Sequence, residues 1–283
     1  VTFVASMLER VIEERAAGDP DKAAHFRQQI TDIVGDDLST IQPGSPQAQE
    51  IKSVLQQKNA WSQYLEVGIG PDAEIFTKSQ PLSAVGWGAQ VGIHPISNWN
   101  NPEPEIVLAV NSNARICGAT LGNDVNLRDV EGRSALLLGK AKDNNGSCAI
   151  GPFIRLFDRE FTLEQVNQAD LQLNISGSDG FQLDAISSMS KISRRPEDLV
   201  SQTLGANHQY PDGLMLFLGT MFSPVKDRDH SGQGFTHHCG DQVSISTASL
   251  GRLSNWVDRC DKIPPWNFGC GALMKNLAAR GLL

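Results

Sequence analysis

Two apolar runs joined by a short polar link restrict the fold of this chain most strongly. Residues 106–110 read IVLAV, residues 115–122 read RICGATLG, and NSNA lies between them. Short runs rich in Val, Ile and Leu, bounded by Asn, Ser and Gly, are typical of the strands of a β-hairpin. We therefore expect an antiparallel hairpin here, with residues 111–114 as its loop.

The chain from Trp61 onward has the same pattern of short apolar runs between polar residues and glycines. Glycines become frequent and the apolar runs are short, which favours strands separated by turns. Further strands are expected at 64–70, 84–93, 171–176, 181–186, 214–222 and 242–246. Helices are expected over 126–139, 195–209 and 271–283. This pattern predicts an α+β, mostly β fold rather than a regular alternation of strands and helices.

The N-terminal part of the chain has a helical pattern instead. Residues 3–16 repeat apolar positions at intervals of three and four. Two further segments, 19–34 and 45–58, each begin with a candidate N-cap, Asp19 or Ser45, that is followed by proline. We therefore expect a layer of helices before the strands begin.

A chain of 283 residues is long enough for two parts, a helical N-terminal segment at 1–60 and a strand-rich domain at 61–283. The formal net charge is −8 without any Lys/Arg block, which argues against a basic nucleic-acid-binding face or binding to an anionic membrane. No stretch reaches the roughly 18 apolar residues of a membrane helix. The cysteines, five in number, match no zinc or disulfide spacing, so we expect reduced thiols in a cytoplasmic protein.

An acidic pair stands at the start of the first hairpin strand. Glu103 and Glu105 are two residues apart, and alternate residues of a strand lie on one face. Two like charges on one face beside a buried run cost free energy unless a positive group lies near them. The pair therefore raises the question of which cation it faces.

The register of the hairpin brings a third carboxylate to the same face. If Ser112 and Asn113 are the two loop residues, Glu105 lies opposite Thr120. Asp124 then lies on the same face as both glutamates. A three-residue loop would reverse this parity, so the prediction depends on the loop.

Three clustered carboxylates without His or Cys favour a hard divalent ion. Mg²⁺ fits, and Mn²⁺ and Ca²⁺ fit as well, whereas zinc prefers nitrogen or sulfur ligands. A solvated acidic hairpin end is the alternative, and a Glu-x-Glu spacing alone does not decide between the two.

Four segments, taken in order, resemble the fumarylacetoacetate hydrolase superfamily: NNPEPEIVLAV, GATLGNDVNLRDVEG, GKAKDNNGSCAIGP and LFLGTMFSPVKDRD. Asp124 follows Glu103 by 21 residues, and Lys142 follows Asp124 by 18. Each segment is a weak signal alone, but their order and spacing together are specific. The resemblance runs from about Glu66 to the C-terminus.

The resemblance implies a mostly β fold with a rolled, twisted central sheet, assembled as a homodimer or homotetramer. It also implies that Glu103, Glu105 and Asp124 are metal ligands and that Lys142 lies beside the metal and contacts the substrate. A second set of positions matches residues of the substrate pocket in the family: Arg128 and Thr220, and also Lys78.

A narrower likeness points to the sugar-acid branch of the superfamily, the 2-keto-3-deoxy-pentonate dehydratases. It rests on SNWNNPEPE, GRSALLLGKAKDNNGSCAIGPFIRLFD and PPWNFGCGALMKNLAARGLL. Members of this branch yield 2-oxoglutarate semialdehyde and usually carry a further N-terminal region, so residues 1–60 are expected to be the end of such a region. Two alternatives remain at this point: a hydrolase of acylpyruvates or 2,4-diketo sugar acids, and a metal-bearing protein without catalysis.

The expected dehydration needs a metal to polarise the keto group, a base near C3 and an acid near the C4 hydroxyl. Lys142 is expected to move a proton or to donate to the keto oxygen. Glu74 lies 29 residues before Glu103 and is the hypothesised general acid/base. Glu131 is expected to support Arg128 or to contact a substrate hydroxyl.

His237, His238 and Cys239 form a second group of metal-ligand types. Adjacent residues on a strand point to opposite faces, so three in a row do not converge on one ion. We therefore expect a loop or a strand end at this position.

Overall fold

The computed structural model describes residues 20–34, 41–220, 226–229 and 234–283. The expected helix at 3–16 and the Asp19 cap lie outside the described residues. The chain falls into two compact units, one formed by the described residues up to Ile75 together with Ser188–Pro211, the other by Phe76–Ser187 and Asp212–Leu283. The domain boundary predicted near residue 61 remains a prediction.

The first unit is helical. It contains α2 (Pro20–Val34), α3 (Pro46–Gln57), α4 (Gln63–Ile69), a 3₁₀ turn η3 (Met189–Lys191) and α8 (Pro196–Thr203). The Ser45 hydroxyl accepts a hydrogen bond from the Ala48 amide at 3.2 Å and so caps α3 as its sequence predicts. The helices predicted at 19–34 and 45–58 are confirmed within a residue at each end. The helix predicted at 195–209 is confirmed only in its first part, because α8 ends at Thr203.

The strand predicted at 64–70 is wrong, because this segment forms α4. Ser62 supplies the N-cap and accepts a hydrogen bond from the Leu65 amide at 3.3 Å. Leu65 and Ile69 are four residues apart and both are buried, which is the spacing of one helix face. The glycines of this segment suggested strands and turns, but the cap and the four-residue spacing decide the structure.

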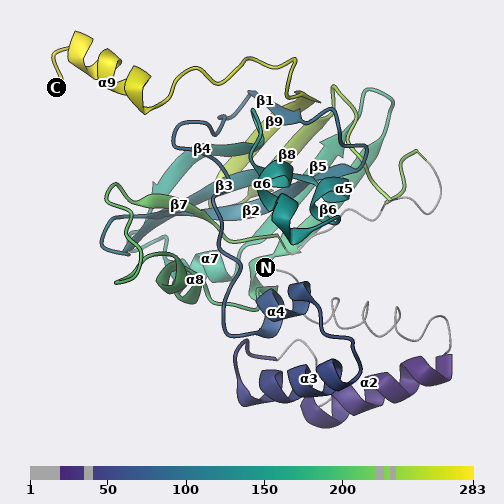
Figure 1. The fold of residues 1–283 in the computed structure, drawn as a ribbon. Coiled ribbons are helices and arrows are strands. Elements are labelled where there is room, and N and C mark those ends of the chain that lie inside the picture. Colours follow the sequence, from purple (N-terminus) through teal and green to yellow (C-terminus); the bar gives the residue numbers. More distant parts are fainter. Residues whose placement is uncertain (1–19, 35–40, 221–225, 230–233) are drawn as a thin grey trace. The chain divides into compact units, whose positions relative to one another are not determined.

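The second unit consists mainly of two β-sheets (Figure 1). The first has the order β1-β9-β8-β5-β6 and the second the order β4-β3-β2-β7. The strands are β1 (Gln90–Ile93), β2 (Asn100–Val110), β3 (Ile116–Leu127), β4 (Cys148–Leu156), β5 (Asp170–Ser176), β6 (Gln182–Ser188), β7 (Leu214–Phe217), β8 (Gln242–Thr247) and β9 (Gly251–Arg259).

The sheets pack against each other, with β3 and β4 beside β8 and β9. These strands carry fully buried aliphatic residues, such as Ala119 and Leu121 on β3 and Ile245 and Leu253 on β8 and β9. Neither sheet closes into a barrel. The predicted α+β fold with a mostly β domain is confirmed.

The helix predicted over 126–139 is broken into short pieces. β3 runs to Leu127, and α5 (Arg128–Glu131), η2 (Ala135–Leu137) and α6 (Leu138–Lys142) follow it. Ser134 starts η2 by accepting a hydrogen bond from the Leu136 amide at 3.2 Å. This unit also contains α7 (Leu163–Asn167) and α9 (Cys270–Ala279), the latter as predicted for the C-terminal segment.

The hairpin of β2 and β3 has a different register from the predicted one but the same parity. Val110 pairs with Ile116, so five residues form the loop and the parity is reversed there. A bulge at Cys117 then adds one residue and restores the parity, since Ala109 pairs with Gly118. Asp124 consequently lies directly opposite Glu103. The prediction that Asp124 shares a face with both glutamates is confirmed, whereas the pairing of Glu105 with Thr120 is wrong.

Within the described residues, none of the helices is long and apolar enough to cross a bilayer. All five cysteines lie in the described part of the chain and none forms a disulfide, which agrees with the predicted free thiols.

Candidate metal centre

Three carboxylates converge where β2 and β3 pair. One oxygen from each of Glu103, Glu105 and Asp124 lies within 4.8 Å of the others. Within the described residues this is the one group of His, Cys, Asp or Glu side chains with such spacing. Asp124 and Glu105 are buried, and Glu103 is half-buried. The pairing of β2 and β3 therefore brings the three predicted ligands together.

Burial makes the negative charges of this cluster costly. Burial, with the nearby charges of Asp124 and Glu103, raises the pKa of Glu105 to about 8. Burial also raises the pKa of Glu103, although Lys142 opposes the rise. A cation that binds these buried carboxylates would therefore offset the cost of their negative charge.

Two buried lysines provide part of that positive charge. Lys142 Nζ lies 2.6 Å from Glu103 Oε2 and 3.3 Å from Asp124 Oδ2. Burial alone would lower the pKa of Lys142, but Asp124 and Glu103 outweigh it and the pKa is raised. Lys78 Nζ lies 2.8 Å from Asp124 Oδ1 and also donates to the carbonyl oxygens of Val125 and Lys142. Asp124 is thus held between two ammonium groups.

The residues present fit a divalent cation. Two ammonium groups leave one formal negative charge on the three carboxylates. Oxygen ligands of this kind suit Mg²⁺, Mn²⁺ or Ca²⁺. Glu103, Glu105 and Asp124 would hold such an ion, with Lys142 and Lys78 beside it.

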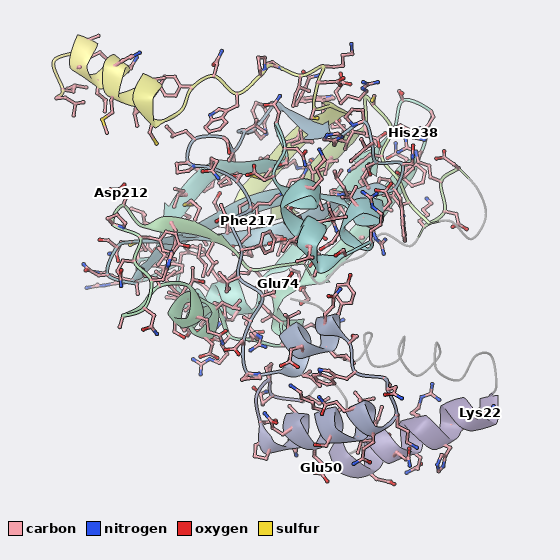
Figure 2. The ribbon with its side chains drawn as sticks, in the orientation of Figure 1. Lys22, Glu50, Glu74, Asp212, Phe217 and His238 are labelled. Carbon is pink, nitrogen blue, oxygen red and sulfur yellow. The ribbon has the colours of Figure 1, made fainter. Side chains whose placement is uncertain are left out.

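The segment that follows β7 fixes Glu105. The backbone amide of Gly219 donates to Glu105 Oε2 at 2.6 Å, which places Thr220 next to the cluster along the chain. Opposite Glu105 stands Gly122, where a Cβ would lie 2.5 Å from both Phe217 and Val107. Phe217, which is labelled in Figure 2, is the last residue of β7 and therefore occupies the space that a side chain at position 122 would need.

Arg128 and Glu131 belong to the short helix that follows β3. The Arg128 guanidinium stacks 4.2 Å from the centre of the Trp99 ring. Glu131 accepts a hydrogen bond from Asn126, which also donates to Glu103. Sequence reasoning missed Asn126, although its place two residues after Asp124 on a strand puts it on the same face.

Glu74 belongs to the first unit, whereas the three carboxylates belong to the second. The guanidinium of buried Arg194 donates to the carbonyl oxygens of Val67, Gly70 and Asp72 at 2.8–3.0 Å. Gln202 accepts a hydrogen bond from the Ala73 amide at 2.5 Å. These contacts fix the backbone that leads to Glu74, while its role in catalysis stays a prediction.

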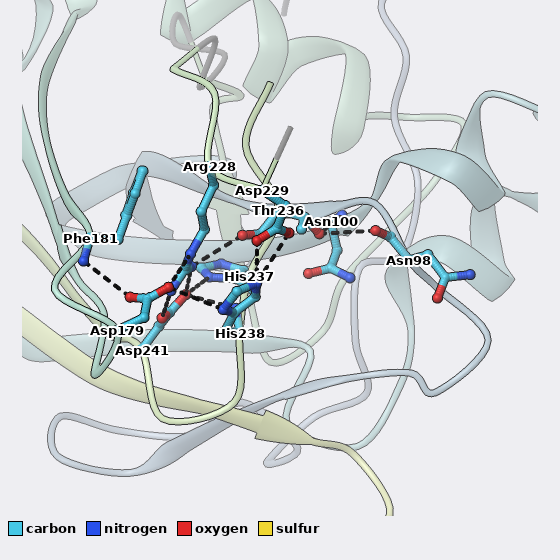
Figure 3. Close-up of polar contacts among 10 residues, drawn as sticks. All are labelled: Asn98, Asn100, Asp179, Phe181, Arg228, Asp229, Thr236, His237, His238 and Asp241. Atoms are coloured by element: carbon cyan, nitrogen blue, oxygen red, sulfur yellow. Dashed lines mark hydrogen bonds and ion pairs between the residues drawn. The ribbon is translucent and has the colours of Figure 1, made fainter. Parts of the chain in front are cut away.

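His237 and His238 belong to a separate polar cluster that precedes β8 (Figure 3). His237 Nδ1 lies 3.2 Å from Asp241 Oδ2, and His238 lies within 3.2 Å of Asp179 and Asp229. Arg228 forms a two-pronged ion pair with Asp241, at 2.6 and 2.7 Å. The histidines lie in a loop, as the argument from strand geometry predicts, and they pair with carboxylates there.

We expect Arg228→Met to lower the free energy of unfolding by about 3–5 kcal/mol, because it leaves the buried Asp241 charge without its main partner. Burial opposes the charge of Asp241, but hydrogen bonds from Arg228 and His237 outweigh it and keep its pKa well below the usual range. Urea unfolding at neutral pH measures the effect. Arg259→Met is the matched control, because Arg259 forms a similar pair with Asp261 on the surface. Equal losses in both variants would contradict this assignment.

Comparison with known proteins now decides the family. Residues 65–258 match the fumarylacetoacetate (FAA) hydrolase C-terminal family, and this match includes Glu103, Glu105, Asp124 and Lys142. The chain belongs to this family. The resemblance inferred from its four motifs is thereby confirmed.

Two curated relatives of this family member are dehydratases. The 2-dehydro-3-deoxy-D-arabinonate dehydratase of Saccharolobus solfataricus is 30% identical over 190 residues, which cover 67% of this chain and 60% of the relative. The probable 2-keto-3-deoxyxylonate dehydratase of Haloferax volcanii is 29% identical over 194 residues, with 69% and 63% covered. The chain thus spans less than two thirds of the length of these relatives.

A solved structure supports the same relationship. The structure described as 2-keto-3-deoxy-D-arabinonate dehydratase complexed with magnesium and 2,5-dioxopentanoate is 30% identical, with a TM-score of 0.60 and coverage of 70% of this chain and 66% of the other. Its fold is therefore shared by the matched part of this FAA hydrolase family member.

Proposed function

We propose that this protein is a metal-dependent hydro-lyase that dehydrates a 2-keto-3-deoxy sugar acid. The substrate class we infer is a 2-keto-3-deoxy-pentonate, such as the acid derived from D-xylonate, and the product is 2-oxoglutarate semialdehyde of pentose catabolism. The observation that carries this proposal is the buried triad of Glu103, Glu105 and Asp124 with Lys142 bound to it. It stands in a chain whose curated relatives are dehydratases of such acids.

A bound divalent cation, Mg²⁺ first and Mn²⁺ or Ca²⁺ as alternatives, supplies Lewis acidity that stabilises negative charge on a keto oxygen. Glu103, Glu105 and Asp124 would hold this cation. Lys142 Nζ donates a hydrogen bond to the keto oxygen or carries a proton between substrate atoms. Its buried position keeps bulk water away from these exchanges.

The proposed reaction removes one proton and one hydroxyl group. Glu74 takes a proton from C3, the C4 hydroxyl leaves as water after it receives a proton, and a C3=C4 double bond forms. Migration of that double bond toward the C5 carbinol gives an enol, which becomes the terminal aldehyde. The other pocket residues bind the carboxylate and hydroxyl groups of the acid: Lys78, Arg128, Thr220 and Glu131.

The function is tested with purified protein, Mg²⁺ and racemic 2-keto-3-deoxy-pentonate, with semialdehyde formation followed through a coupled aldehyde dehydrogenase. We expect turnover that EDTA abolishes and Mg²⁺ restores. An acylpyruvate is assayed in parallel for C–C bond hydrolysis. Cleavage of the acylpyruvate without semialdehyde formation from the sugar acid would contradict the proposal and favour the hydrolase.

We further propose that residues 61–283 form the catalytic domain and that the protein works in the cytoplasm as a homodimer or homotetramer. Support for the assembly comes from the resemblance to the family. Light scattering of the purified protein measures its mass directly.

A further inference from the structure

A buried amide lies between the metal-ligand cluster and a fourth carboxylate. Asn126 Nδ2 lies 2.9 Å from Glu103 Oε1 and 2.6 Å from Glu131 Oε2. Asn126 is 5% exposed, so water does not replace these contacts freely. Its position on β3, directly opposite Asn101 on β2, places it on the hairpin face that carries the carboxylates.

The two hydrogen bonds fix the orientation of the Asn126 amide. An amide nitrogen has two protons, and here one is directed to each carboxylate. The reversed orientation would place the amide oxygen against two anionic groups, which repel it. Asn126 Oδ1 has no hydrogen-bond partner among the described residues, so nothing on the oxygen side competes with this arrangement.

Glu103 is consequently held at both of its oxygens. Asn126 binds Oε1, and Lys142 binds Oε2 at 2.6 Å. Glu131 lies near enough to raise the pKa of Glu103 by its charge, and Asn126 lies between the two carboxylates. Without that amide, Glu103 would be held at Oε2 alone and would face the charge of Glu131 without a donor between them.

We propose that Asn126 and Glu131 form a positioning pair that orients Glu103 for the divalent cation. Asn126 donates to Glu103 directly, and Glu131 acts through Asn126 by holding its second proton. This inference rests on the proposed metal site, but not on the identity of the substrate. Removal of residues that orient metal ligands typically lowers metal affinity by about 10–100-fold.

Isothermal titration of Mg²⁺ or Mn²⁺ into the metal-free protein tests the pair without substrate. We expect Asn126→Ala to weaken the metal affinity by about 10–100-fold, and Glu131→Ala to weaken it by a smaller factor. Asn101→Ala is the matched control, because Asn101 is a buried asparagine opposite Asn126 whose amide donates to the Pro102 carbonyl oxygen. We expect its metal affinity to remain that of the unaltered protein. Thermal unfolding of each variant verifies that it is folded.

A double-mutant cycle separates positioning from a general loss of packing. If Glu131 acts through Asn126, Glu131→Ala has no further effect on metal affinity once Asn126 is alanine. Additive losses, or equal weakening by Asn101→Ala, would overturn the pair. An Asn126→Ser variant that folds and retains full metal affinity would overturn it as well. Dehydratase turnover is measured separately on the unaltered protein. Weakened metal binding in the variants, together with no turnover by the unaltered protein, would contradict the proposed function and leave the pair standing.

Discussion

Lys142→Met is expected to lower the turnover number by about 10²–10⁴-fold, the usual contribution of a positioned proton-transfer group. The methionine has a similar length but no ammonium group, so neither hydrogen bonding nor proton transfer at the keto oxygen remains. Because Lys142 Nζ occupies oxygens of Glu103 and Asp124, its removal should leave the Mg²⁺ affinity equal or tighter. Coupled-assay kinetics and isothermal titration on the same preparation measure both effects.

The metal-free Lys142→Met protein should also unfold more easily, by about 3–5 kcal/mol, because Glu103 and Asp124 lose a buried partner. Mg²⁺ should restore much of this loss, so its effect on the melting temperature should exceed that in the unaltered protein. Lys140→Met is the matched control, since Lys140 lies on α6 but its exposed ammonium contacts His94. Normal turnover in Lys142→Met, or loss of its metal binding, would contradict the assigned role.

Glu105→Gln is expected to weaken Mg²⁺ binding by at least about 100-fold and to abolish turnover with it, because a buried anionic ligand becomes a neutral one. The hydrogen bond from the Gly219 amide is retained by the glutamine oxygen. The metal-free variant should nevertheless be more stable at pH 7 than the unaltered protein. The two effects have opposite signs, which general misfolding cannot produce.

The greater stability of the metal-free Glu105→Gln variant follows from the raised pKa of Glu105, which is about 8 in the folded chain. A carboxyl group whose pKa is higher when folded lowers stability at any pH above its unfolded pKa of about 4.3. The stability gain of Glu105→Gln is therefore full near pH 8, smaller at pH 6 and absent near pH 4. Urea unfolding across this range measures it, with Asp143→Asn, an exposed carboxylate beside Lys142, as control. Destabilisation of the metal-free variant at pH 7 would be the contrary result.

Strand periodicity was sufficient to predict which three carboxylates converge at the candidate metal centre. A period of two places Glu103 and Glu105 on one face of β2, and the preserved parity of the hairpin adds Asp124. The register itself was not predictable, because neither the five-residue loop nor the bulge at Cys117 has a signal in the sequence. The five-residue loop and the one-residue bulge each reverse the parity of the pairing, so their effects cancel at the three carboxylates.

Strand periodicity could not predict the residues that reach the carboxylates from distant segments of the chain. Lys78 and Gly219 approach Asp124 and Glu105 only through tertiary structure. Asn126 could have been found, since it shares the face of Asp124, but an amide gives no motif signal by itself.

Two strands were missed because their sequences lack a clear pattern. β4 contains Gly151 and Pro152, which is tolerated because β4 lies at a sheet edge. β9 is interrupted by polar residues, and only its inward positions, such as Leu253 and Val257, are apolar and buried. Sequence texture alone therefore underestimates the extent of both sheets.

Anomalous scattering from crystals soaked in Mn²⁺ tests the central claim of the metal centre most directly. We predict one strong peak per chain, within coordination distance of carboxylate oxygens from Glu103, Glu105 and Asp124, and no such peak in Glu105→Gln crystals soaked in the same way. A peak at another site, or fully occupied manganese in the Glu105→Gln crystals, would contradict the account.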